Sequence, residues 1–163
     1  MITAIRRFFD ENLKPAPGDS KDSSCCKVQL ATAALLFELL KTDSHIDQRE
    51  TDALREVLKR TFAMDEQTLV EIIALAEAEA HQATSLYEFT SLINEGYSYP
   101  QKTELIENMW RVAFADHVLD KYEEALIRRT ADLIYVTHAD FIRTKLAVRD
   151  QLAANQKSSS KSS

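Results

Sequence analysis

Glycine and proline are scarce in this chain of 163 residues, which contains only two glycines and three prolines. A phosphate-binding loop, a dinucleotide fingerprint and a multi-strand sandwich all need more of these turn-forming residues. The only two cysteines, Cys25 and Cys26, are adjacent, which is poor geometry for a stabilising disulfide and fits a reducing compartment. No apolar run has the length of a secretory signal or a membrane anchor. These absences argue against glycine-loop nucleotide chemistry and predict a cytoplasmic protein.

Basic residues are also in the minority, with 20 Lys and Arg against 26 Asp and Glu and a formal net charge of −6. Nucleic-acid binding draws on counterion release by a basic surface, so we expect no nucleic-acid partner. Hydrophobic residues make up 45% of the chain and charged residues 28%, a balance that is typical of a globular domain.

Helical periodicity is what the chain has in abundance, because apolar residues recur at helical spacing in seven segments between residues 27 and 152. The segment from Val28 to about Thr42 is apolar almost all round and predicts a central buried helix.

Three helix ends carry local signals. Ser85 with Glu88 predicts a capping box at the start of the fourth segment, and Gly96 predicts a left-handed residue at its end. Thr137 with Asp140 resembles a capping box and opens the seventh segment.

Composition divides the chain into four parts. We expect an amphipathic helix over residues 1–13, a linker rich in proline and serine over 14–26, a helical domain over 27–152 and a disordered tail over 153–163. The apolar stripe of the first part either packs on the domain, which we favour, or serves as a peripheral membrane or partner-docking helix. The stripe consists of Ile2, Ile5, Phe8, Phe9 and Leu13.

An internal repeat joins the two halves of the domain at an offset of 73 residues, which places Asp43 on Asp116. At the same offset Asp47 falls on Asp120 and Glu50 falls on Glu123, and each half contains three helices. The predicted fold is therefore all-α. It is a compact bundle of about seven helices built from two pseudo-twofold three-helix halves, with the short amphipathic helix in front.

The repeat places the same acidic pattern at the turn that follows each buried helix, and we call these two turns, residues 43–50 and 116–123, the elbows. Four of the acidic residues fit N-caps with acidic first turns, which the helix dipole favours. These four are Asp47, Glu50, Asp120 and Glu123.

Asp43 and Asp116 are harder to explain as caps, because each ends a helix where partial negative charge accumulates. Either each carboxylate accepts a backbone N–H bond across the elbow, or a cation compensates it. Clustered carboxylates suit the hard divalent cations Ca²⁺, Mg²⁺ and Mn²⁺.

Other sites find no support in the sequence. The elbow is too short for an EF-hand loop and lacks its central glycine. His45 and His117 do not superpose in the repeat, so neither is assigned as a ligand, and zinc and di-iron motifs are missing from the sequence. We assign no catalytic residues, because no nucleophile, base and oxyanion donor recur together.

Three stretches resemble the tellurite-resistance TerB family, and more closely its cytoplasmic TerB-like branch: LLKTDSHIDQRE (39–50), FTSLIN (89–94) and MWRVAFADHVLDKYEEALIRR (109–129). The resemblance spans about residues 28–149 and implies an all-helical fold of two similar halves. It also implies metal chelation by the elbow acids, which here map to Asp43, Asp47, Glu50, Asp116, Asp120 and Glu123. The chain departs from the family at Ser44, His45 and His117, where family members often carry glycine.

These observations predict a non-enzymatic, cytoplasmic, TerB-like module that binds a divalent cation at its elbows and docks partner proteins; the link to stress comes from the resemblance. One alternative is a metal-dependent hydrolase that uses the elbow carboxylates. A second is a purely structural adaptor in which the acids only cap helices and no metal binds.

Overall fold

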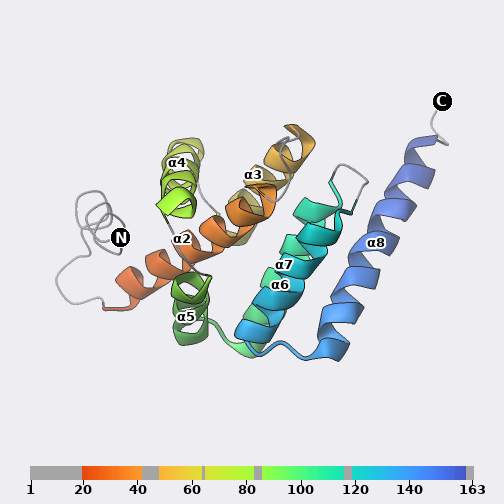
Figure 1. The fold of residues 1–163 in the computed structure, drawn as a ribbon. Coiled ribbons are helices and arrows are strands. Elements are labelled where there is room, and N and C mark those ends of the chain that lie inside the picture. Colours follow the sequence, from red (N-terminus) through yellow and green to blue (C-terminus); the bar gives the residue numbers. More distant parts are fainter. Residues whose placement is uncertain (1–19, 42–47, 64, 83–85, 116–118, 161–163) are drawn as a thin grey trace.

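Seven helices make up the part of the chain that the computed structural model describes, which is residues 20–41, 48–63, 65–82, 86–115 and 119–160 (Figure 1). No residue in these ranges lies in a β-strand, so the predicted all-α fold is confirmed for them. In chain order the helices are α2 (Ser20–Lys41), α3 (Gln48–Phe62), α4 (Glu66–Gln82), α5 (Tyr87–Gly96), α6 (Tyr99–Ala113), α7 (Lys121–Leu133) and α8 (His138–Ser160). None of them combines the length and apolar character that a bilayer-spanning helix needs.

The central position of α2 follows from its sequence, which is apolar on every side. Between Val28 and Leu40 only Gln29 and Glu38 are not buried. The helix packs against α3, α4, α5, α6 and α7. Because each fully buried leucine contributes about 1.5–3 kcal/mol, this helix dominates the stability of the bundle, and the predicted buried helix is confirmed.

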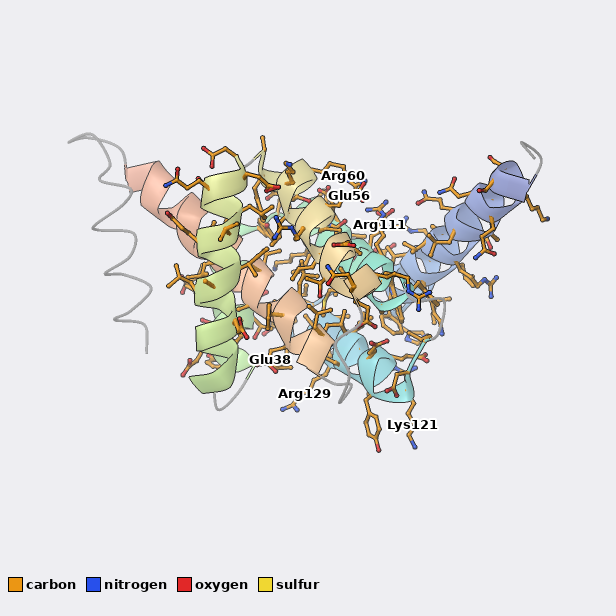
Figure 2. All side chains as sticks on the ribbon, turned by 90° about the horizontal axis from the view of Figure 1, so that it is seen from above. Glu38, Glu56, Arg60, Arg111, Lys121 and Arg129 are labelled. Carbon is orange, nitrogen blue, oxygen red and sulfur yellow. The ribbon has the colours of Figure 1, made fainter. Side chains whose placement is uncertain are left out.

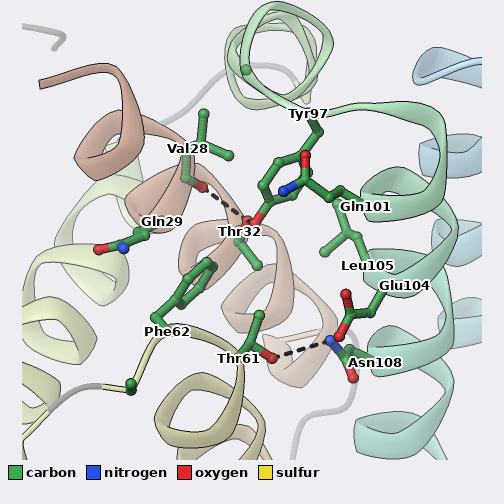
Figure 3. A pocket seen from close by; sticks show the side chains of 12 residues that line it. Val28, Gln29, Thr32, Thr61, Phe62, Tyr97, Gln101, Glu104, Leu105 and Asn108 are labelled. Atoms are coloured by element: carbon green, nitrogen blue, oxygen red, sulfur yellow. Dashed lines mark hydrogen bonds between the residues drawn. The ribbon is translucent and has the colours of Figure 1, made fainter. Parts of the chain in front are cut away.

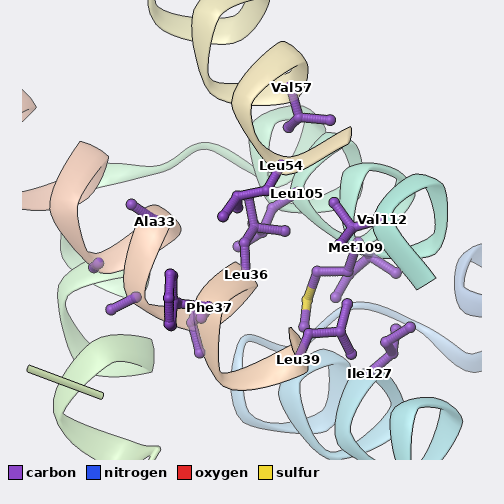
Figure 4. Packing of buried hydrophobic residues seen from close by; sticks show 14 of the residues in the cluster. Ala33, Leu36, Phe37, Leu39, Leu54, Val57, Leu105, Met109, Val112 and Ile127 are labelled. Carbon is purple, nitrogen blue, oxygen red and sulfur yellow. The ribbon is translucent and has the colours of Figure 1, made fainter. Parts of the chain in front are cut away.

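The seam between α2 and α6 is the second main element of the core. Figure 4 shows Leu36 of α2 and Met109 of α6 among side chains from α3 and α7, and both are fully buried. Trp110 of α6 is also fully buried, and its ring centroid lies 5.2 Å from that of Phe141 in α8. The core is thus continuous from α2 to α8.

The two sets of three helices share a packing pattern. In the first set α2 contacts α3 and α4, and α3 contacts α4. In the second set α6 contacts α7 and α8, and α7 contacts α8. The cross-contacts α2 with α7 and α3 with α6 also correspond. This pattern agrees with the predicted repeat, whereas the pseudo-twofold relation itself stays a prediction.

Two predicted boundaries are wrong for the described residues. Helix α2 begins at Ser20, so residues 20–26 are helical where the linker over 14–26 was expected. Helix α8 continues to Ser160, so residues 153–160 are helical where the disordered tail over 153–163 was expected. Extending an existing helix fixes one residue per hydrogen bond, so packed helices continue through polar flanks. The predicted amphipathic helix over residues 1–13 lies outside the described residues.

Helix α5 corrects the prediction for Gly96. Its backbone is not left-handed; instead a Cβ at this position would lie 2.1 Å from Cγ2 of Val28, so the glycine allows α5 to approach α2 closely. The other half of that prediction, the capping box at Ser85, lies outside the described residues. The helix starts after Leu86, which makes no side-chain cap bond.

Left-handed backbone occurs instead at two residues with side chains, Ala63 after α3 (φ 50°) and Tyr135 after α7 (φ 63°). Tyr135 belongs to a Schellman motif, in which the Val136 N–H donates to the Ala131 carbonyl at 2.9 Å. Glycine is the usual residue in this position, so both turns carry backbone strain.

The third helix of each set begins with a different cap. At α4 the Asp65 carboxylate accepts from the Thr68 N–H at 2.8 Å, and this hydrogen bond lowers the pKa of Asp65. At α8 the Thr137 hydroxyl accepts from the Asp140 N–H at 3.2 Å, which confirms one half of the predicted capping box. The Asp140 carboxylate binds Tyr99 of α6 instead of completing the box. The bond from Tyr99, followed by the bond from Arg143, holds the pKa of Asp140 below its usual value.

Candidate functional site

Three of the six predicted elbow ligands lie in the described residues, namely Glu50, Asp120 and Glu123. The other three, Asp43, Asp47 and Asp116, lie outside them, as do His45 and His117. Within the described residues no three His, Cys, Asp or Glu side chains gather closely enough to hold a metal ion. The geometry of the candidate site is therefore built from the first turns of α3 and α7.

The first turn of α7 is a complete capping box. Asp120 is the N-cap, and its carboxylate accepts from the Tyr122 N–H at 3.0 Å. The Glu123 carboxylate accepts in return from the Asp120 N–H at 3.4 Å. The predicted capping role of Asp120 and Glu123 is thereby confirmed. A carboxylate has about four acceptor positions, so the cap bond from Tyr122 occupies only part of the capacity of Asp120.

Glu50 and Glu123 share a position and an environment. Each is the third residue of its helix, and the two are related by the repeat offset. Glu50 is 1% exposed and Glu123 is 2% exposed, whereas glutamate in general is almost never fully buried. The helix dipole stabilises a carboxylate at this position, but the desolvation of each ion still costs several kcal/mol. Both elbows thus bury a glutamate carboxyl group in the first turn of the helix that follows.

Glu124, the next residue of α7, has a different role. Its carboxylate lies 3.0 Å from Nζ of Lys145 and 3.7 Å from Arg128. The Lys145 ammonium also lies 5.5 Å from the ring centroid of Trp110. Glu124 therefore links α7 to α8 through basic side chains at the surface.

A cavity of about 570 Å³ lies between α2, the end of α3 and the start of α6, and the sequence analysis did not identify it (Figure 3). Thr32 and Asn108 are buried polar residues in its wall. The Thr32 hydroxyl donates to the Val28 carbonyl at 2.8 Å, and the Asn108 amide donates to Thr61 at 3.4 Å. The signal that could have found them is a polar residue on an otherwise apolar helix face.

A second cavity of about 610 Å³ lies where α3, α6 and the start of α8 meet. It includes Arg60 of α3 and Arg111 of α6, which are labelled in Figure 2. Arg111 donates to Glu107 at 2.7 Å, and Arg143 pairs with Asp140 at 3.1 Å. Its cations are thus largely balanced by nearby acids, so the cavity shows no excess charge that would favour an ion.

One of the comparisons with known proteins identifies a family. The family model described as Tellurite resistance protein TerB matches residues 29–146, from the first half of α2 into α8. No curated protein and no solved structure matches the chain.

Proposed function

Because the chain belongs to the tellurite resistance protein TerB family, whose model matches residues 29–146, we propose a non-enzymatic cytoplasmic module that binds a divalent cation at its acidic elbows. We propose further that it docks partner proteins in a stress response. The proposed ligands are Asp43, Asp47, Glu50, Asp116, Asp120 and Glu123.

The observation that carries the cation proposal is the burial of Glu50 and Glu123 in equivalent first turns. One buried carboxylate can be explained by a cap, but two at the same position of both halves suggest a common purpose. A cation that binds across an elbow would offset the desolvation of the buried charge. Oxygen ligands of this kind favour Ca²⁺, Mg²⁺ or Mn²⁺ over softer metals.

The capping box of α7 favours a second candidate, a structural adaptor without metal. Asp120 and Glu123 satisfy each other's backbone N–H groups there, and such a box stabilises a helix start without any ion. The two candidates differ in one measurable respect, which is whether the folded protein takes up a divalent cation.

The test is thermal unfolding of the full chain with and without millimolar CaCl₂, MgCl₂ or MnCl₂. A cation that binds only the folded state stabilises it by about 2.7 kcal/mol at 100 times its Kd. We expect one of these salts to raise the Tm, and the double variant Asp43→Asn with Asp116→Asn to lose the increase. The double variant Asp52→Asn with Asp150→Asn removes the same charge from exposed positions on α3 and α8, and it should keep the increase.

Glu50→Gln separates the two candidates further, because it keeps the shape of the side chain and removes its charge. The cation proposal expects Glu50→Gln to reduce the cation-dependent increase. The adaptor candidate expects no such increase in the original protein. A Tm that none of the three salts changes would overturn the cation proposal, and so would an equal increase in the Asp43→Asn, Asp116→Asn variant.

A further inference from the structure

We propose that the cleft between α5 and the end of α7 binds an arginine side chain on a basic segment of a partner protein. The cleft has a volume of about 380 Å³ and is open to solvent. Its walls come from two helices that contact each other, α5 and α7. The residues that line it are Tyr87, Thr90, Ser91, Asn94, Glu95, Asp132, Leu133 and Tyr135.

The charge of the cleft is of one sign. Glu95 and Asp132 are both exposed, and no Lys or Arg is among the described residues that line the cleft. Neither carboxylate forms an ion pair with a basic side chain in the described ranges. The second cavity differs in this respect, since Arg60, Arg111 and Arg143 line it together with its acids. The cleft therefore complements a cation.

Two aromatic rings border the same cleft and are unusually accessible. Tyr87 is 69% exposed and Tyr135 is 75% exposed. The faces of such rings attract ammonium and guanidinium groups. Tyr135 already has a cation near its ring, because Nζ of Lys102 lies 5.9 Å from the ring centroid without lining the cleft.

The backbone at Tyr135 supports a functional role for this ring. Its φ of 63° lies in the left-handed region, where a glycine would remove the strain. A tyrosine in this position therefore places a large ring beside the cleft at a cost in stability. Strain of this kind is concentrated at binding sites.

Asn94 adds an unused acceptor to the wall of the cleft. Its amide Nδ2 donates to the Leu133 carbonyl at 3.0 Å, and this bond determines which way the amide group faces. Its Oδ1 atom is buried and accepts no hydrogen bond from the described residues. A buried acceptor without a donor is unfavourable, and a ligand N–H group reaches this oxygen only when the wall of the cleft opens around Asn94.

Arginine fits these features better than lysine. The guanidinium group has five N–H donors in one plane, which can stack on a tyrosine ring while donating to carboxylate and amide oxygens. A lysine ammonium has three donors and no flat face. The net charge of −6 also favours the approach of a basic partner.

The test is an NMR titration of the full chain with an acetylated, amidated peptide that carries two arginines spaced by glycine. The matched peptide contains citrulline, which keeps the shape of arginine and removes its charge. We expect the arginine peptide alone to shift the side-chain amide signals of Asn94 and the ring signals of Tyr87 and Tyr135. Asp132→Asn should weaken the binding, and added salt should weaken it further.

Tyr135→Gly is the decisive variant, because it removes the ring and relieves the strained backbone together. Its fold is therefore not at risk, and we expect the affinity to fall roughly two- to five-fold, the range of an exposed cation–π contact. Tyr122→Ala removes another exposed tyrosine, 61% accessible, from the start of α7 and should leave the affinity unchanged. Equal binding of the citrulline peptide, equal loss in Tyr122→Ala, or no shift of the cleft signals at 10 mM peptide would overturn the proposal.

Discussion

The two central helices, α2 and α6, are covered to different extents. Helix α2 contacts five other helices, while α6 contacts α2, α3, α7 and α8. The difference comes from α5, which packs on α2 and has no counterpart on α6 in the described residues. Consequently α6 keeps polar side chains such as Glu104 and Arg111 beside the two larger cavities. The comparison indicates that, in the described part of the chain, α2 is covered by neighbouring helices on more sides than α6.

The largest loss of stability should come from truncating buried side chains where α2 packs against α6. Leu36→Ala and Met109→Ala should each lower the free energy of unfolding by about 2–5 kcal/mol, because both side chains are fully buried. Denaturant titration measures both losses. Val70→Ala is the control, since Val70 is 53% exposed and its loss should stay within about 0.5 kcal/mol. A loss for Met109→Ala as small as that of the control would mean that α6 contributes little to the core.

A smaller loss of stability should follow from disturbing the contact with α5, which α2 makes and α6 does not among the described residues. Gly96→Ala would place its Cβ 2.1 Å from Cγ2 of Val28, so we expect a loss of about 1–3 kcal/mol. In the double variant with Val28→Ala the clash disappears, and the added cost of Gly96→Ala should be close to zero. The four proteins form a double-mutant cycle that urea unfolding can measure. If the cost of Gly96→Ala were the same with either residue at position 28, the close approach of α5 to α2 would not be its cause.

The smallest expected effect is a gain in stability at the two strained turns, which follow α3 and α7. Ala63→Gly and Tyr135→Gly should each raise the free energy of unfolding by about 1 kcal/mol, because each relieves a left-handed backbone. Tyr135→Ala keeps a Cβ in the same conformation and should give no gain. Calorimetric melting of the three variants checks this. A gain at Ala63 without one at Tyr135 would show that the tyrosine ring stabilises the second turn.

The sequence was sufficient to predict the helices and the central position of α2, because the periodicity of apolar residues is a local signal. The observed burial of these residues agrees with it. It was not sufficient for Gly96, whose reason is a methyl group of Val28 in another helix. The ends of α2 and α8 were misplaced because composition does not show how far a packed helix continues.

Some features of the candidate site were also predictable from the sequence, and others were not. Asp120 and Glu123 were predictable as caps because a capping box is a pattern within four residues. The burial of Glu50 and Glu123 depends on contacts that a single sequence does not display. The cleft that ends at Tyr135 was missed for the same reason, since α5 and α7 meet only in the fold.

The chain's only tryptophan, Trp110, has a consequence for spectroscopy. Its fully buried indole lies 5.8 Å from the ring centroid of Phe114 and 5.2 Å from that of Phe141, and it is therefore shielded from water in the folded protein. The fluorescence signal comes from the contact of α6 with α8, whereas far-ultraviolet circular dichroism reports on all helices at once. If the two halves unfold together, both signals change at the same denaturant concentration. If the first half outlasts the second, the fluorescence changes first, and the inequality of the halves becomes visible in one sample without any substitution.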